Sequence, residues 1–371
     1  MHTCAIRSVL ISGGGIAGAT LAHWLLRFGF KLTVVEQAKG QRSSGNVVDI
    51  RGPALPIVRS MGLLSALRKF ATRATGAEIV DSSGARIAGM PGPNATRAGS
   101  EDEIEVTRAD LASVLLRSCD GAEMIFGESI NELSQDAGGV DVRIGSGTER
   151  RFDLLIGADG LHSITRRLIF GNSEQFVRQL GMYVGTLACP ELDLDTMAVQ
   201  LYNAPGRLVA IHPGRDTPGA AFIFRHHEIR DLDHRDTQHH RKLIMTTYAG
   251  DGWRVPELLD HVRNTDDLYF DAVSRVRLPR WSRGRVALVG DAASCVSVLG
   301  DGSTKAIAGA YTLAKELAGT DDHEVAFRRY QDRHKRLISS PASVWLGSSF
   351  LVPATGFGIT MRNRLLRLIA R

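Results

Sequence analysis

The stretch Ser8-Val-Leu-Ile-Ser-Gly-Gly-Gly-Ile-Ala-Gly-Ala-Thr-Leu-Ala-His-Trp-Leu-Leu-Arg-Phe-Gly29 decides the fold of this chain. Its apolar start, Val9 to Ser12, predicts a buried strand, and apolar residues recur at helical spacing after the glycines, as far as Phe28. Gly29 is the residue type that often follows the end of a helix. The stretch therefore predicts a strand, a tight turn and a helix, which together form the first unit of an α/β fold.

The glycines between this strand and helix have the spacing GxGxxG. Gly13 allows the tight turn, Gly15 lets a pyrophosphate approach the backbone, and Gly18 lets the helix pack closely on the strand. Ile16 and Ala17 fall in the first helical turn, where the N–H groups and the helix dipole favour negative charge. The pattern predicts a site for a dinucleotide.

A second predicted strand, Lys31 to Glu36, strengthens this prediction. It ends in an acid 18 residues after Gly18 (36 − 18), where dinucleotide-binding folds place the carboxylate that binds a ribose. An acid there favours a free 2′-hydroxyl, as in FAD or NAD, over NADP, but it does not separate FAD from NAD. We expect Glu36 and its neighbour Gln37 to line the site.

Two later stretches also end a predicted strand with glycine and an acid. They are Phe152-Asp-Leu-Leu-Ile-Gly-Ala-Asp-Gly160 and Gly284-Arg-Val-Ala-Leu-Val-Gly-Asp291, and the second continues through a loop into a helix that begins near Ser303. Strands of one parallel sheet converge on a single dinucleotide at their carboxyl ends. We therefore expect further cofactor contacts from Asp159, Gly160, Gly290, Asp291, Gly300, Gly302 and Ser303.

Two arginines are additional candidates. Arg51 ends an extended run, Val47 to Arg51, that also holds Asp49; a cofactor contact and a local ion pair explain it equally well. Arg108 follows Thr107, a predicted helix cap, so it lies in a first turn, where the helix dipole disfavours a cation. Its position there suggests a phosphate or ring edge as its partner, with plain solvent exposure as the alternative.

Size and composition exclude several classes of protein. The chain has 371 residues, 43% of them hydrophobic and 23% charged, with a net charge of +5 that is spread along the sequence. This composition is ordinary for a soluble globular protein, and the charge is weak evidence for nucleic acid binding. The four cysteines show no metal-binding or disulfide spacing, and no apolar run is long enough to cross a bilayer. We expect a cytoplasmic protein with no metal and no integral membrane segment.

The remaining segments predict a second sheet and terminal helices. Short alternating runs from Gly181 to His227 predict an antiparallel sheet, suitable as the wall of a substrate pocket. The histidine-rich segment 231–240 lacks metal-ligand spacing and is expected to be a solvated loop or the start of a helix. Leucines and arginines at helical spacing in 359–371 predict a helix that packs on the protein with its arginines outward. The alternative for this helix is an anionic membrane surface.

Taken together, the three strand-end motifs resemble those of the single-component FAD-dependent aromatic hydroxylases of the para-hydroxybenzoate hydroxylase type. The resemblance covers almost the whole chain and is nearest to the tetracycline-modifying monooxygenases. It implies a Rossmann-like FAD-binding domain with an interleaved antiparallel-sheet substrate domain and C-terminal helices. The implied boundaries are 1–76, 101–171 and 271–320 for FAD binding, 77–100 for a substrate-side hairpin and loop, 172–270 for the substrate sheet and 321–371 for the terminal helices.

The resemblance also implies roles and a reaction. Glu36 would bind the adenosine ribose, Arg108 would lie near the flavin and pyrophosphate, Asp159 would serve FAD and NADPH, and Asp291 would hold the ribityl region. NADPH or NADH would reduce the flavin, which would then capture molecular oxygen as a hydroperoxide and hydroxylate an aromatic or polyketide-like substrate. A monomer or homodimer without nucleic acid is expected, and catalytic and substrate-binding residues remain unknown.

One loop departs from the family pattern. Where relatives carry a histidine or aromatic residue and prolines after the Gly-Asp motif, this chain has Ser294, Val296 and Val298, and Asp301 stands in the glycine turn. Asp301 would oppose the charge of a reduced, anionic flavin, and Lys305 would offset it. A non-oxidative, cyclase-like flavoprotein and a flavoprotein that only sequesters a planar compound therefore remain alternatives to the monooxygenase.

Overall fold

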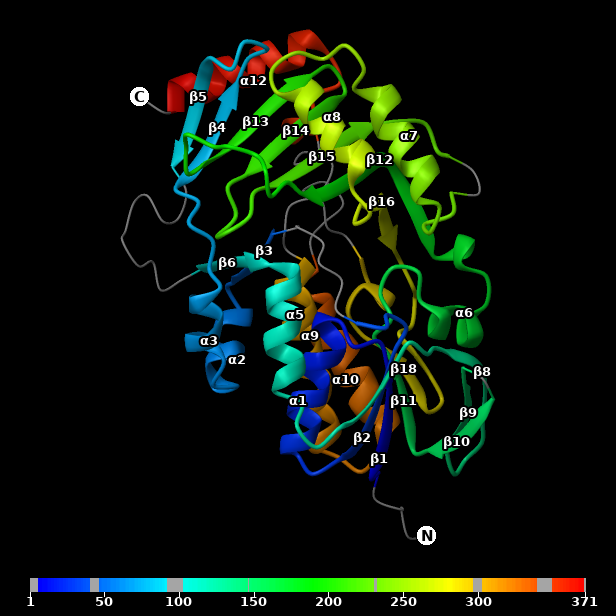
Figure 1. Ribbon diagram of the computed structural model, residues 1–371. Helices are drawn as coiled ribbons and strands as arrows, with labels where there is room; N and C mark the ends of the chain where they lie inside the picture. The colour runs from blue at the N-terminus through cyan, green and yellow to red at the C-terminus, as the bar shows by residue number, and fades with distance from the viewer. Residues whose placement is uncertain are drawn as a thin grey trace.

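A computed structural model describes residues 6–40, 47–91, 103–145, 147–229, 232–295, 302–338 and 349–369. Two large sheets lie one above the other, with the N-terminus near the lower sheet and the C-terminal helix at the upper one (Figure 1). The lower sheet has six strands in the order β17-β18-β11-β1-β2-β7, all parallel except β17. Its strands are β1 (Ser8–Ser12), β2 (Lys31–Glu36), β7 (Glu123–Phe126), β11 (Leu154–Gly157), β17 (Ser282–Arg283) and β18 (Val286–Leu288).

Different layers cover the two faces of this sheet. Along β1, Val9 and Ile11 point into a core shared with helices, whereas Leu10 points into a core shared with a small antiparallel sheet, because successive side chains of a strand alternate. The helices are α1 (Ile16–Arg27), α5 (Arg108–Arg117), α9 (Gly302–Ala318) and α10 (His323–Lys335). The small sheet has the strands β8 (Ile130–Gln135), β9 (Val140–Ile144) and β10 (Thr148–Phe152).

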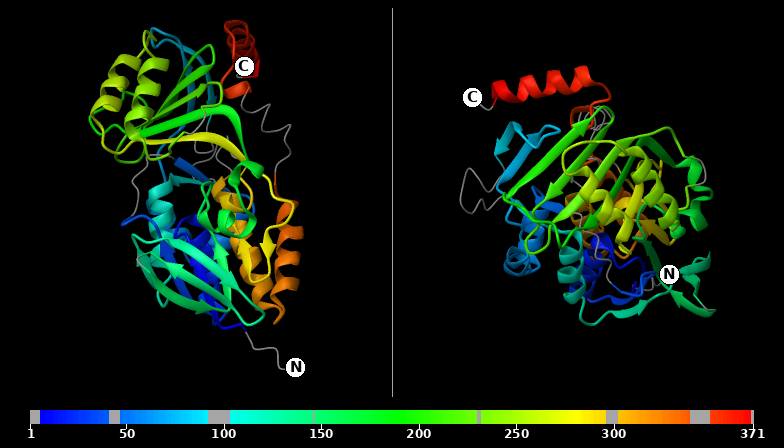
Figure 2. Two further views of the ribbon diagram at one scale, coloured as in Figure 1. Left: turned by 90° about the vertical axis from the view of Figure 1, so that its right-hand side faces the viewer. Right: turned by 45° about the horizontal axis from the view of Figure 1, so that its top comes forward.

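The upper sheet has seven strands in the order β16-β12-β15-β14-β13-β4-β5, and every pairing except β13 with β4 is antiparallel. Helices α7 (Thr237–Thr247) and α8 (Val255–Asn264) cover one face of it, as Figure 2 shows. The strands are β4 (Gly76–Val80), β5 (Arg86–Pro91), β12 (Val177–Ala188), β13 (Ala198–Ala204), β14 (Arg207–His212), β15 (Gly219–Arg225) and β16 (Tyr269–Val276).

Short elements connect the two sheets. The ribbon of β3 (Val47–Arg51) and β6 (Glu103–Thr107) lies between them (Figure 1). The other connecting and terminal elements are α2 (Ala54–Ser60), α3 (Leu64–Lys69), α6 (Ile164–Phe170), η1 (Ser173–Gln175), η2 (Gly290–Ala292) and α12 (Gly356–Ile369).

The expected α/β fold is confirmed, while the proposed domain boundaries stay a prediction. Thr107 is the predicted cap of α5, since its hydroxyl accepts a hydrogen bond of 3.0 Å from the Asp110 N–H. Apolar residues at helical spacing from Ala54 to Phe70 predict one helix, but this prediction is wrong, because Gly62, with φ of +77°, separates α2 from α3. The outward orientation expected for the arginines of α12 is wrong for Arg362, which is buried. Among the described residues, three cysteines are buried thiols rather than disulfides.

Candidate cofactor site

The strand ends that carry the glycine and acidic motifs lie side by side. Backbone hydrogen bonds extend the parallel ladder just past each strand, from Gly13 N to Val35 O (2.7 Å), from Ala158 N to Ser12 O (2.7 Å) and from Val289 N to Gly157 O (2.9 Å). Motifs that are more than 100 residues apart in the sequence therefore meet at one edge of the six-stranded sheet. This is the carboxyl edge, where open α/β sheets bind their ligands.

Two glycines of the first motif are required by close backbone contacts. Gly13 has φ of +106°, and a Cβ on it would lie 2.5 Å from the Ala158 carbonyl oxygen. A Cβ on Gly18 would lie 1.9 Å from the Gly13 carbonyl oxygen. Any side chain at either position would force the turn and helix α1 apart, so these glycines shape the loop.

Gly15 differs from them, because it faces open space. It is the N-cap of α1, it has no side-chain cap, and a Cβ on it would meet nothing within 4 Å. Ile16 and Ala17 form the first turn behind it. A helix N-terminus with an open approach at its cap fits a pyrophosphate group, because the amides and the dipole face the anion.

Glu36 is held firmly at the end of β2. Its carboxylate accepts hydrogen bonds from Gly14 N (2.7 Å) and Ala38 N (2.8 Å), one on each oxygen. The glycine loop and the predicted ribose ligand are therefore joined directly. Each carboxylate oxygen can accept a further hydrogen bond, which leaves Glu36 able to bind a ribose, and Gln37 is exposed beside it.

The Asp159 carboxylate is used by its own loop. It accepts hydrogen bonds from Ser163 Oγ (2.5 Å), Thr165 N (2.8 Å) and Thr165 Oγ1 (2.8 Å). Gly160 follows with φ of +75° and open space above it. This geometry favours a role for Asp159 in placing the Gly160 backbone over a direct contact between its carboxylate and a cofactor.

Arg166 lies in α6, six residues after the Gly160 that ends the second motif, and was not predicted as a site residue. Its guanidinium is fully buried and donates to Leu161 O (2.6 Å) and Ala292 O (3.1 Å). Burial lowers the pKa of this guanidinium, and the nearby Asp159 carboxylate opposes that shift. A buried arginine is rare, and this one ties the loop after β11 to the loop after β18.

A group of charged side chains lies around the Gly290-Asp291 turn. Burial raises the pKa of Asp291, and the positive charges of Arg108 and Lys305 oppose that shift. Arg108 begins α5 and is exposed. A small cavity of about 10 Å³ at this turn is lined by Gly290, Asp291, Ser294, Gly302, Lys305, Ala306 and His334. The prediction that Arg108 meets an anion here is compatible with its position near Asp291.

Arg51 and Ser303 have partners within the protein. The Arg51 guanidinium lies 3.9 Å from Asp49 and 3.6 Å from Glu103, so the ion-pair alternative is present. The Ser303 hydroxyl donates to the Asp49 carbonyl oxygen at 2.6 Å. These contacts attach the start of α9 to β3. Gly300, another of the predicted cofactor contacts, lies outside the described residues.

The structure decides which side chains of the upper sheet face the cofactor edge. Phe270 and Ala272 point into the core under α7 and α8, so Tyr269 and Asp271 lie on the opposite face. Burial raises the pKa of Tyr269. The charge of Asp291 raises this pKa further, and the charge of Arg108 lowers it. Thr186, paired with Tyr269 across β12 and β16, is buried with an unpartnered hydroxyl. No sequence signal marked these residues, because strand orientation was undetermined.

Histidines cluster where this face meets the loop after β11. The Nε2 atom of His162 lies 3.0 Å from the Asp271 carboxylate, and its ring stacks on His234 with centroids 4.4 Å apart. Burial and the neighbouring His162 lower the pKa of His234. Within the parts of the chain that the structure describes, no group of His, Cys, Asp and Glu has metal-binding geometry.

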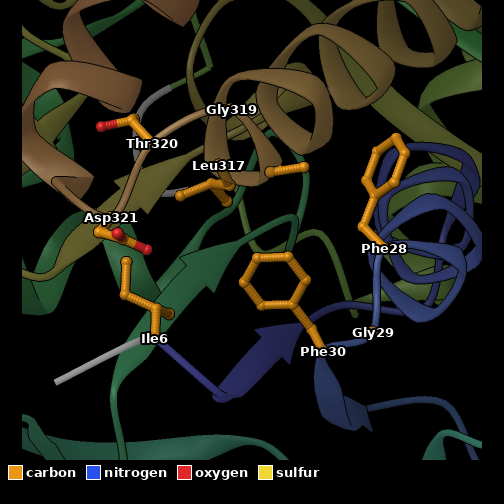
Figure 3. Close-up of a pocket in the computed structure, with 9 residues that line it drawn as sticks. Ile6, Phe28, Gly29, Phe30, Leu317, Gly319, Thr320 and Asp321 are labelled. Carbon is orange, nitrogen blue, oxygen red and sulfur yellow. The ribbon is translucent and has the colours of Figure 1, made fainter.

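A larger cavity, of about 350 Å³, is lined by none of the residues of these motifs, and Figure 3 shows the side chains around it. It opens where Ile6 and Phe30 precede β1 and β2, at the amino edge of the sheet, beside the last turns of α1 and α9. Ligands of parallel sheets bind at the opposite edge, so size does not make this cavity the cofactor site. Its lining is Ile6, Phe28, Gly29, Phe30, Leu317, Ala318, Gly319, Thr320 and Asp321.

Comparisons with known proteins show the family of this chain. Residues 7–324 match the FAD binding domain family. A flavin-dependent monooxygenase of Legionella longbeachae is 34% identical over 93% of this chain and 90% of its own length, and the uncharacterized protein Rv1260 of Mycobacterium tuberculosis is 39% identical over 88% and 89%. The crystal structure of the tetracycline destructase Tet(55) matches with a TM-score of 0.83 and 31% identity, over 100% of this chain and 97% of that one.

The chain therefore belongs to the FAD binding domain family, and within it to the FAD-dependent monooxygenases near the tetracycline-modifying branch. Its cofactor is FAD. The site fits this group on its own geometry, because the open cap at Gly15 and the anchored Glu36 lie where a pyrophosphate and a ribose bind in such folds. No described helix has both the length and the apolar content that crossing a bilayer requires.

Proposed function

We propose that this enzyme uses NADPH or NADH to hydroxylate an aromatic or polyketide-like small molecule with molecular oxygen. One arrangement supports the proposal most directly: Tyr269 and Asp271 lie on the face of the upper sheet opposite α7 and α8, and the charges of Arg108 and Asp291 at the cofactor edge act on the pKa of Tyr269. A substrate on this face of the sheet would therefore lie next to the flavin. The similarity to tetracycline destructases supports a planar, oxygen-rich substrate.

The chain's residues would hold FAD in three places. The open cap of α1 at Gly15 would receive the pyrophosphate, Glu36 the adenosine ribose, and the Gly290-Asp291 turn the ribityl region. Arg108 and Lys305 supply positive charge near Asp291. When bound, FAD supplies the hydride-accepting and oxygen-activating chemistry, and the protein supplies orientation, charge and exclusion of water.

The substrate would rest on the face of the upper sheet opposite α7 and α8. There Ala210, Ala221 and Ile223 offer a smooth apolar wall, and their partial exposure shows that no described element covers them fully. The buried, unpartnered Thr186 hydroxyl would hydrogen-bond a polar substituent, because an unsatisfied buried hydroxyl gains from such a partner. We infer that this wall fixes the substrate ring relative to the flavin.

The decisive experiment follows NADPH oxidation, oxygen uptake and product mass with tetracyclines and simpler phenols. We expect a yellow protein whose flavin is bleached by anaerobic NADPH, and a product that carries one oxygen atom from ¹⁸O₂. Conversion without NADPH or oxygen would contradict hydroxylation and support the cyclase-like alternative. Return of unchanged ligand with no NADPH oxidation would support sequestration.

The location and assembly of the enzyme are further parts of the proposal. A cytoplasmic location fits the buried thiols Cys119, Cys189 and Cys295, and a monomer or homodimer is expected. Fractionation and size-exclusion chromatography with light scattering test these two points.

A further inference from the structure

The outer face of α12 carries a continuous apolar stripe. Phe357 is 76% exposed, Leu368 70%, and Met361 and Leu365 50% each. At 100° per residue these four side chains fall within one narrow arc of the helix. Single exposed hydrophobic residues need no explanation, but a stripe along one helix face marks an interaction surface.

The inner face of α12 is already used for folding. Leu366 packs with Ile79 and Ala88 of the upper sheet. The buried Arg362 donates to Asn203 Oδ1 (2.8 Å), and Arg367 Nε donates to Ile87 O (3.0 Å). The stripe is therefore turned away from the protein. The helix lies at the periphery of the molecule beside β5 (Figures 1 and 2). The stripe does not require the helix to detach in order to act.

The charge carried by α12 itself is of one sign. Arg364 and Arg367 are exposed on this helix, and the helix contains no aspartate or glutamate. Arg364 adjoins the stripe, at the next position around the helix from Phe357. An apolar face bordered by cations is the pattern of a helix that lies in the interface of an anionic lipid surface.

We propose that α12 docks this enzyme, as a peripheral protein, on membranes that contain anionic lipids. Phe357, Met361, Leu365 and Leu368 enter the boundary between head groups and acyl chains, while Arg364 binds a lipid phosphate. The 14-residue helix is about 21 Å long, so it can lie in the plane of the interface.

A second copy of the chain is the less favoured occupant. Symmetric pairing through α12 would bring two copies of Arg364 together, and neither helix has an acid to neutralise them. Four side chains also cover much less than the roughly 800 Å² per partner of a stable interface. Lipid phosphates provide the missing negative charge, which a second α12 does not.

The test is sedimentation of the full-length, FAD-loaded protein with vesicles of phosphatidylcholine alone or with phosphatidylglycerol. We expect binding to the anionic vesicles to be at least about tenfold tighter, and to weaken in about 1 M salt, where charge interactions are screened within about 3 Å. The double variant Phe357→Ser/Leu368→Ser and the variant Arg364→Glu should each lose about tenfold or more in affinity. Phe126→Ser, which changes a half-exposed phenylalanine on β7, should bind like the parent.

FAD content measured for each variant shows whether it is folded. Equal sedimentation with both vesicle types, or no loss in the α12 variants, would overturn the proposal. Light scattering without lipid tests whether a second copy of the chain covers the stripe. A dimer that Phe357→Ser converts to a monomer would assign the stripe to a second copy and would also overturn the membrane proposal. None of these outcomes depends on catalysis, so they are independent of the proposed reaction.

Discussion

At the scale of single residues, Gly15 separates cofactor binding from folding. We expect Gly15→Ala to fold normally, because its Cβ would meet nothing within 4 Å, yet to bind FAD about tenfold more weakly, because the methyl group enters the space proposed for the pyrophosphate. Fluorescence titration of the apoprotein with FAD measures the change. Gly356→Ala, at another open glycine, is the matched control. Unchanged affinity in Gly15→Ala would mean that the phosphates lie elsewhere.

His334 makes stability depend on pH. It is buried between Tyr330 and Trp281, with an unpartnered Nδ1, and burial lowers its pKa from 6.5 to about 4. Between these values the unfolded chain holds one more proton than the native protein. The contribution of the neutral His334 to the free energy of unfolding is therefore complete above pH 6.5, and it falls by about 1.4 kcal/mol per pH unit down to about pH 4.

Denaturant unfolding of the parent and of His334→Gln between pH 7 and pH 4 tests this. Because carboxylates also titrate in this range, the measure is the difference between the two proteins. We expect the parent to lose its stability more steeply than the variant as the pH falls. Parallel curves would show that His334 is protonated in the native state as readily as in the unfolded chain.

At the scale of elements, Arg166 links the loops that follow β11 and β18. Arg166→Met keeps most of the side-chain volume but leaves the carbonyls of Leu161 and Ala292 without their donor. We expect a loss of about 2–4 kcal/mol in stability, since each unsatisfied buried carbonyl costs about 1–3 kcal/mol. We also expect a lower affinity for FAD. Thermal unfolding and flavin content measure the two effects. Arg167→Met, at the exposed neighbouring position, should change neither.

At the scale of the whole molecule, the FAD edge draws on segments from much of the chain. Removal of FAD should therefore lower the stability of the six-stranded unit as a whole. A ligand present at about 100 times its Kd stabilises the native state by about 2.7 kcal/mol. We expect the thermal midpoint to fall by a few degrees on deflavination and to recover when FAD is added. A protein whose thermal midpoint is the same with and without FAD would contradict an FAD site at this edge.

Local patterns predicted much of this protein. The glycine spacing, the acid after the second strand and the later strand-end motifs predicted the fold and a dinucleotide site, because backbone approach and strand–helix packing restrict those positions to a few residue types. The family that these motifs resemble then implied FAD. Thr107 was likewise predicted as a cap from its position. Such features depend on neighbours within a few residues, so they are visible in the chain itself.

Other features depend on contacts between distant segments. The sequence suggested the Asp159 carboxylate as a ligand, but the tertiary structure commits it to Ser163 and Thr165. It could not place Thr186 or Tyr269, because the face that a strand side chain occupies depends on register and on which layer covers the sheet. The apolar and basic pattern of α12 was visible in the sequence. Only packing on β5 and β13 decided that Leu366 faces inward and Phe357 faces solvent, because burial is a property of the assembled layers.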